Sequence, residues 1–266
     1  MNAGSVSISS VDSDKWLVDS FVKCTFLGLI LIAFASIAFS QRPVTIFLAG
    51  DSTMAAKTDD KRPETGWGEK LEAHFKAGTV KVENRAMNGR STKSFIDEGR
   101  WQKIIDDLRK GDWVFIEFGH NDEKKESPDR YASPEDYRKN LIRFISDVKA
   151  KHGNPLMMTP VMRRRFDKDG KFYDTHGEYP DVVRSVATEY KVPLIDMHKL
   201  SEVVIVKYGE EGSKKLFLQL KQGENANYPK GVEDNTHFSP LGAEEMAAAA
   251  VAEIKVKQIG LRRLIR

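Results

Sequence analysis

Four short polar segments of the sequence carry the residue types that nucleophilic acyl transfer requires. A serine hydroxyl is a weak nucleophile and needs an adjacent base, a role that histidine can fill while a carboxylate orients its ring. Ser52 follows a short apolar run, and Asp234 and His237 stand three residues apart. This pattern predicts Ser52 as the nucleophile, His237 as its base and Asp234 as the orienting carboxylate. The segments are Gly50-Asp51-Ser52-Thr53, Asn84–Ser91, Gly119-His120-Asn121-Asp122 and Asp234–His237.

Three groups in these segments could stabilise the oxyanion of a tetrahedral intermediate, which needs hydrogen-bond donors. They are the backbone N–H of Ser52, the backbone N–H of Gly89 and the side-chain amide of Asn121. Glycine at position 89 lets the backbone come close to a ligand. Each segment alone is a weak signal, because Gly-Asp-Ser and Asp-x-x-His also occur as turns and caps. The prediction therefore depends on their order and on the elements that they follow.

The elements that must position these segments alternate between short apolar runs and amphipathic stretches. Near-continuous apolar strands separated by helices predict an α/β domain with a parallel sheet covered on both faces. Ligand sites in such sheets lie beyond the carboxyl ends of the strands, which is where three of the four segments stand. The predicted strands are Val44–Ala49, Val80–Glu83, Trp113–Phe118, Leu156–Met158 and Pro193–Asp196. The predicted helices are Gly66–Lys76, Ile96–Leu108 with a break at Gly99, Pro134–Lys151, and one that starts at Ser239-Pro240.

The first 40 residues have the pattern of an export signal. The apolar run Cys24–Phe39 follows Lys23, and Ala38 and Ser40 are small residues before a cut at Gln41. We therefore expect a signal peptide over residues 1–40, with an uncleaved membrane anchor as the alternative. Residues 41–266 are then a single exported domain, periplasmic or secreted, without an integral membrane segment after processing.

Composition argues against several other classes of protein. The formal charge of +3 comes from 42 basic and 39 acidic residues, too small an excess to indicate a nucleic-acid binder. The sole cysteine, Cys24, lies in the predicted signal, so the rest of the chain offers no thiolate nucleophile or Cys-ligated metal. His237 and Asp234 have no further metal ligands at convincing spacing, and we expect neither a metal nor a cofactor. The oligomeric state is left open.

At these residues the chain resembles the SGNH subgroup of the GDSL hydrolases, whose four named residues map to Ser52, Gly89, Asn121 and His237. The longer matches resemble the rhamnogalacturonan acetylesterase branch. The resemblance implies a flavodoxin-like three-layer α/β/α sandwich around a five-stranded parallel sheet. It also implies a Ser-His-Asp triad, no cofactor, and removal of acetyl groups from pectin. The longer matches are Gly50–Ala55, Asn88–Thr92, Phe118–Asp122 and Asp234–Gly242.

Several residues are candidates for contact with a polysaccharide substrate. Arginine pairs bidentately with carboxylates, and pectin carries uronate groups, so the run Arg163-Arg164-Arg165 after the fourth strand could recognise them. A solvated loop balanced by Asp167 and Asp169 is the alternative. His120 and His176 are further candidates, each with a structural hydrogen bond as the competing interpretation.

Two other functions remain open at this point. The first is a general small-ester esterase or a lysophospholipase-type lipase that uses the same site. The second is a catalytically silent carbohydrate-binding protein on the same fold. The intact set of Ser52, Gly89, Asn121 and His237 favours an enzyme over the silent protein.

Overall fold

The computed structural model describes residues 1, 3–4 and 42–266. The chain divides into two units, Met1–Arg42 and Pro43–Arg266, and the second unit contains the sheet and its helices. The predicted signal peptide falls almost entirely outside the described residues. Within the described part of the chain, no helix has the length and apolar character needed to cross a membrane.

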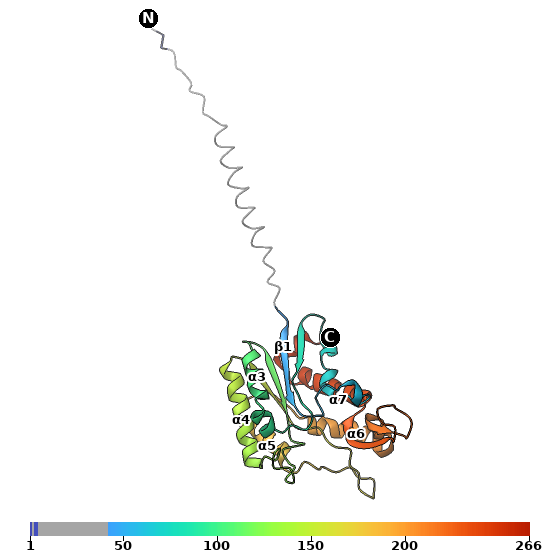
Figure 1. Cartoon of the computed structure of the whole chain (residues 1–266). Coiled ribbons are helices and arrows are strands. Elements are labelled where there is room, and N and C mark those ends of the chain that lie inside the picture. Colours follow the sequence, from blue (N-terminus) through green and yellow to red (C-terminus); the bar gives the residue numbers. More distant parts are fainter. Residues whose placement is uncertain (2, 5–41) are drawn as a thin grey trace. The chain divides into compact units, whose positions relative to one another are not determined.

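A five-stranded parallel sheet forms the centre of the domain, as predicted (Figure 1). Its spatial order is β2-β1-β3-β4-β5, so β1 lies between β2 and β3. This order reverses direction at β1, and ligand sites in open sheets lie at that switch point. The loops that follow β1, β2 and β3 therefore meet at one edge. The strands are β1 (Val44–Gly50), β2 (Val80–Asn84), β3 (Trp113–Glu117), β4 (Asn154–Met158) and β5 (Leu194–Ile195).

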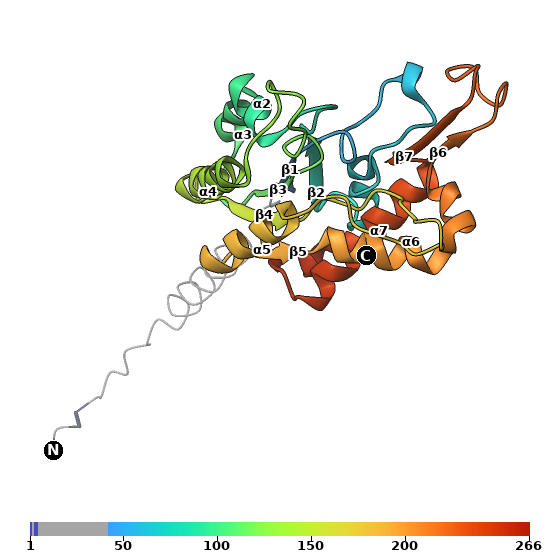
Figure 2. The same ribbon diagram turned by 90° about the horizontal axis from the view of Figure 1, so that it is seen from below.

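Helices cover both faces of the sheet (Figure 2). Alternate residues of a strand point to opposite faces, and in β1 Ile46 and Leu48 join one core while Phe47 and Ala49 join the other. The first core is closed by α6 and α7, and the second by α2, α3, α4 and α5. This is the three-layer α/β/α arrangement. The helices are α2 (Thr92–Asp97), α3 (Arg100–Asp107), α4 (Pro134–Ala150), α5 (Tyr179–Glu189), α6 (Met197–Ser213) and α7 (Pro240–Val256).

The predicted helix starts at Ser133 and Ser239 are confirmed. Ser133 Oγ accepts a hydrogen bond from the backbone N–H of Asp136 at 3.1 Å, and Ser239 Oγ accepts one from Gly242 at 3.2 Å. Each serine caps N–H groups that have no partner within the helix, and a proline fills the first helical position. The predicted break at Gly99 is also confirmed, because that residue has a φ of 68° between α2 and α3.

The predicted helix Gly66–Lys76 is wrong. The segment forms two short 3-10 turns, Trp67–Glu69 and Glu72–His74. Gly66 packs so closely on the nucleophile loop that a Cβ there would lie 2.1 Å from the carbonyl oxygen of Ala55. The N–H of Trp67 donates to the carbonyl of Thr53 at 2.9 Å. These tertiary contacts override the local helical pattern.

An antiparallel pair of strands, β6 (Phe217–Leu220) and β7 (Val232–Phe238), lies outside the main sheet and was not predicted. Helix α6 was not predicted either. The fourth polar segment, Asp234–His237, belongs to β7 rather than to a loop before the last helix. The pair therefore has a direct part in building the candidate site.

Candidate active site

Ser52, His237 and Asp234 form one hydrogen-bonded chain. His237 Nε2 lies 2.8 Å from Ser52 Oγ, and His237 Nδ1 lies 2.7 Å from Asp234 Oδ2. Ser52 and His237 are 185 residues apart in sequence, so only the fold brings them together. Ser52 is 9% exposed, while the side chains of His237 and Asp234 are 29% and 26% exposed. The arrangement can move a proton from the hydroxyl to the imidazole beside a negative charge.

A bulge in β7 brings the side chains of His237 and Asp234 into contact. Phe238 pairs with Phe217 and Glu233 with Gln219, so the residues between them on β7 bulge out of the ladder. Asp234 Oδ1 accepts hydrogen bonds from the backbone N–H groups of Thr236 and His237, at 2.7 Å and 2.9 Å. The aspartate thus folds its own segment into a short turn, as the three-residue spacing predicted.

Arg164 braces this bulge. Its backbone N–H donates to the carbonyl of Asn235 at 2.8 Å, and its guanidinium donates to Asn235 Oδ1 at 3.1 Å. The same guanidinium also donates to Ser213 Oγ and to the carbonyl of Glu210. Arg164 is therefore buried with its guanidinium occupied, and its side chain positions the β7 bulge that carries His237. Its contact with substrate stays a prediction.

The three candidate oxyanion donors are available. Within residues 42–266, neither the N–H of Ser52 nor the N–H of Gly89 donates a hydrogen bond to the protein. Asn121 uses one amide hydrogen on the carbonyl of Arg90 at 3.1 Å, which leaves the second free. Gly89 has a φ of 76°, a conformation that favours glycine. Asp122 ties two of these loops together, since its Oδ1 accepts from the N–H of Thr92 at 2.9 Å.

The charge state of Asp234 suits a carboxylate that stabilises an imidazolium. Burial opposes its ionisation, but hydrogen bonds from the ring of His237 and from two backbone N–H groups outweigh burial. Together with the charge of His237, they lower the pKa of Asp234 to about 2. The carboxylate is therefore ionised over the whole range in which a histidine changes its charge.

Two carboxyl groups below the nucleophile behave in the opposite way. Asp51 and Glu117 are fully buried, and burial raises the pKa of both, that of Glu117 to about 8. The charge of Asp51 adds to the rise at Glu117. Glu117 accepts hydrogen bonds from Trp67 Nε1 at 2.7 Å and Thr53 Oγ at 3.3 Å. These contacts support the turn that carries Ser52.

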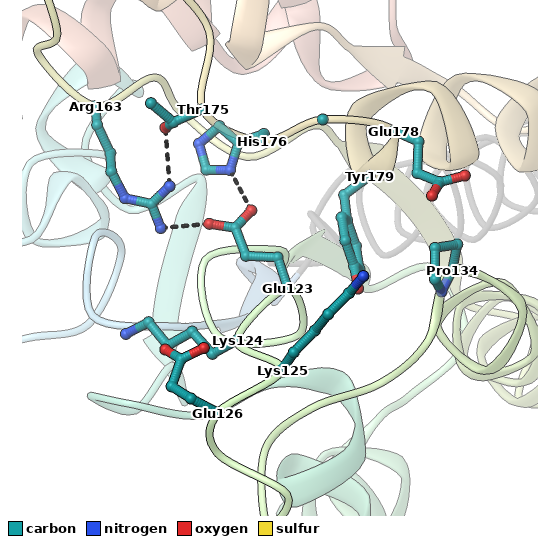
Figure 3. A pocket seen from close by; sticks show the side chains of 11 residues that line it. Glu123, Lys124, Lys125, Glu126, Pro134, Arg163, Thr175, His176, Glu178 and Tyr179 are labelled. Carbon is teal, nitrogen blue, oxygen red and sulfur yellow. Dashed lines mark hydrogen bonds and ion pairs between the residues drawn. The ribbon is translucent and has the colours of Figure 1, made fainter.

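A pocket of about 510 Å³ opens beside the Asn121 loop and contains two of the predicted substrate residues (Figure 3). Figure 3 shows Glu123 between Arg163 and His176, with ion pairs of 2.6 Å and 2.8 Å. The other ring nitrogen of His176 lies 2.8 Å from the carbonyl oxygen of Val161. His176 is thus buried with both ring nitrogens paired, and its contact with substrate stays a prediction. Arg163 borders the pocket with its guanidinium already paired.

The two remaining substrate candidates differ in exposure. Arg165 is exposed. His120 is 3% exposed and its ring packs edge-on against His176, with ring centroids 4.6 Å apart. Among the described residues, neither ring nitrogen of His120 has a hydrogen-bond partner. Burial, followed by the charges of His176 and Arg163, holds the pKa of His120 well below its usual range, so the ring is neutral. A contact of either residue with substrate stays a prediction.

Sequence reasoning missed Lys57, a fully buried lysine beneath Ser52. A lysine side chain is normally exposed to solvent, and one of its acceptors, Asn88, lies in the loop after β2, so the local sequence does not indicate its burial. Within the described part of the chain, no group of three or more His, Cys, Asp or Glu side chains is placed to hold a metal ion.

Comparisons with known proteins place this site in a family. Residues 48–244 match the model of the GDSL-like lipase/acylhydrolase family. The chain is 41% identical to rhamnogalacturonan acetylesterase RhgT of Bacillus subtilis, over 83% of this chain and 93% of that protein. It is 36% identical to the probable rhamnogalacturonan acetylesterase YesY of the same organism, over 81% of this chain and 94% of that protein.

A solved structure has the same architecture. The crystal structure of YxiM from Bacillus subtilis superimposes with a TM-score of 0.70 and 26% identity, and the match covers 82% of this chain and 57% of that one. The match to the family model includes Ser52, Gly89, Asn121 and His237. On its sequence, its fold and the geometry of these residues, the chain belongs to the GDSL-like lipase/acylhydrolase family.

Proposed function

We propose that this protein is a carbohydrate esterase that removes O-acetyl groups from a rhamnogalacturonan-type pectic polysaccharide. The observation that carries the proposal is the hydrogen-bonded chain from Ser52 through His237 to Asp234. The identity to RhgT, over nearly the whole length of that relative, supports the choice of acetyl group and polymer. The predicted export supports it too, because a polysaccharide meets an esterase outside the cell.

In the proposed mechanism, His237 Nε2 accepts the proton of Ser52 Oγ as that oxygen attacks the acetyl carbonyl. The imidazolium then forms against the ionised Asp234, which stabilises its charge. The backbone N–H groups of Ser52 and Gly89 and the Asn121 amide donate to the oxyanion. His237 returns the proton to the leaving sugar hydroxyl, and the acetyl-enzyme remains. A water molecule, deprotonated by His237, then attacks this ester, and His237 delivers that proton to Ser52 Oγ as acetate leaves.

The pocket beside the Asn121 loop is where we place the sugar that neighbours the acetylated one. It begins two residues after Asn121, and Lys124 at its edge donates to Asn121 Oδ1 at 3.3 Å. Its lining is mostly polar and charged, which suits a hydrated sugar better than an acyl chain. This lining favours a carbohydrate ester over a lipid ester as the substrate.

The test is acetate release from a panel of acetylated polysaccharides, alongside aryl esters of increasing acyl length. We expect fastest release from acetylated rhamnogalacturonan, slower release from acetylated xylan, and a steep fall in rate as the acyl chain lengthens. The Ser52→Ala variant should release no acetate above background. Faster cleavage of long-chain esters than of acetate esters would contradict the proposal and favour a lipase.

A further inference from the structure

The buried Lys57 joins the two loops that supply the backbone oxyanion donors. None of its side chain is exposed. Its ammonium group meets three acceptors: the backbone carbonyl of Ser52, Asn88 Oδ1 at 2.8 Å and Glu64 Oε1 at 2.8 Å. An ammonium has three N–H donors, so each of them is used. A buried charge is tolerated when it is paired and fully hydrogen-bonded, and Lys57 meets both conditions.

The acceptors of Lys57 stand next to the groups that the mechanism needs. Ser52 lies in the loop after β1 and carries both the nucleophile and one oxyanion donor. Asn88 lies in the loop after β2 and directly precedes Gly89, the second donor. A separate bond, from the N–H of Met87 to the carbonyl of Gly50 at 3.0 Å, joins the same loops further from Gly89. Lys57 therefore fixes the loop spacing at the point closest to the donors.

We propose that Lys57 is a positioning residue that holds the N–H groups of Ser52 and Gly89 at the spacing of a single oxyanion. The proposal rests on the esterase function proposed for the same site. Misplaced donors weaken interactions that are made in the transition state and leave substrate binding intact. Loss of Lys57 should therefore lower kcat and leave KM unchanged, whereas a lysine with a purely structural role would affect stability alone.

The primary test is the Lys57→Met variant of the full chain, with an aryl acetate as substrate and at a temperature well below the variant's Tm. We expect kcat to fall by about 10- to 100-fold, somewhat less than the loss of an entire donor, with KM changed by less than about twofold. The matched control is Glu64→Gln, which disrupts the same buried ion pair but leaves the bonds from Lys57 to Ser52 and Asn88. This control should lower Tm and keep kcat within about threefold of the wild type.

A second variant keeps the test decisive if Lys57→Met does not fold. Asn88→Ala removes one end of the link without deleting the buried charge, and it should lower kcat in the same way. Because both changes break one link, the double variant should lose no more activity than the worse single variant. Hydrogen exchange of the backbone amides at 87–90 should accelerate in Lys57→Met and Asn88→Ala but not in Glu64→Gln.

Each contrary result has a distinct meaning. If the wild-type protein cleaves aryl acetate but Asn88→Ala and Glu64→Gln have the same kcat, the positioning role is overturned. The esterase function would then still stand. Additive losses in the double variant, or a rise in KM with unchanged kcat, would overturn it as well. A wild-type protein without esterase activity would overturn the proposed function instead, and unchanged amide exchange at 87–90 would still decide against the link.

Discussion

Carboxyl groups at the rim of the active site and on its floor have opposite electrostatics. Asp234, at the rim, is about a quarter exposed and receives two backbone hydrogen bonds and one from His237, so its pKa falls to about 2. Glu117, on the floor, is fully buried near a second acid, Asp51, and its pKa rises to about 8. Burial opposes ionisation of both carboxyl groups. Their pKa values differ because Asp234 is hydrogen-bonded to His237, whereas Glu117 lies near another acid.

The rim and the floor therefore have different roles in the site. The rim carries a charge that takes part in each proton transfer, whereas the floor holds Glu117, which stays neutral at mildly acidic pH and supports the Ser52 turn. Variants at the rim should therefore change activity far more than stability. Variants on the floor should change stability and its dependence on pH.

The largest effect is expected from the nucleophile and its base. Ser52→Ala or His237→Ala should lower kcat by about 10⁶-fold, and the double variant should lose no more, because the two residues act as one unit. Circular dichroism should show the wild-type fold in both. Additive losses in the double variant would show that the two residues act independently, which would contradict a shared proton transfer at the rim.

The next effect tests the carboxylate at the rim. Asp234→Asn should lower kcat by about 10⁴-fold, because the amide favours the wrong tautomer of His237. The asparagine oxygen can keep the backbone hydrogen bonds to Oδ1 but not the charge beside His237, so stability at neutral pH should fall by at most about 2.5 kcal/mol. A loss of less than about tenfold in kcat would mean that His237 does not depend on Asp234.

Two of the three arginines after β4, Arg164 and Arg165, form a matched pair of variants. Arg164→Ala should destabilise the fold by about 1–3 kcal/mol, because it removes the buried guanidinium hydrogen bonds to Asn235 Oδ1, Ser213 Oγ and the carbonyl of Glu210. It should also lower kcat, since the bulge carries His237. Arg165→Ala, an exposed neighbour, should change stability by less than about 0.5 kcal/mol. Equal stability losses in thermal unfolding of the two variants would contradict the bracing role of Arg164.

The pH dependence of stability separates the rim from the floor. The folded pKa of Glu117 lies above its unfolded value of 4.5, so the unfolded state loses its proton first and stability falls as pH rises from about 4.5 to about 8. For Asp234 the folded pKa lies below 3.8, and stability falls as pH drops from about 3.8 to about 2. Either slope is at most about 1.4 kcal/mol per pH unit for one group.

Denaturant unfolding across this pH range checks the assignment. Glu117→Gln should flatten the neutral side of the stability curve, and Asp234→Asn should flatten its acid side. A Glu117→Gln protein that keeps the wild-type slope between pH values of about 5 and 8 would show that Glu117 does not hold its proton in the folded state.

Much of the rim could be predicted from sequence because its residues follow strand ends. The apolar runs before Ser52 and Gly119 fix two adjacent parallel strands, and the switch-point rule places the residues after them at one edge. The short spacing of Asp234 and His237 similarly implies a local turn. That spacing alone was enough to indicate that the carboxylate could reach the ring.

The rest depends on contacts between distant segments. The pattern of Gly66–Lys76 indicates a helix, but close packing of Gly66 against Ala55 overrides it. The residue types of Lys57 and Arg164 indicate solvent exposure, and their burial depends on Asn88 and Asn235, which belong to other segments of the chain. The β6–β7 pair was missed because its active segment, Asp234–His237, is polar and bulged rather than an alternating strand.

In the proposed mechanism, Ser52 carries the acetyl group during turnover. The most direct test is acid quenching of the wild-type protein during steady-state hydrolysis of an acetyl ester, followed by mass spectrometry of its peptides. We expect a mass gain of one acetyl group on the peptide that contains Ser52, and none in Ser52→Ala. Continued acetate release by Ser52→Ala, or a quenched acetyl group on another residue that turns over at the catalytic rate, would contradict it.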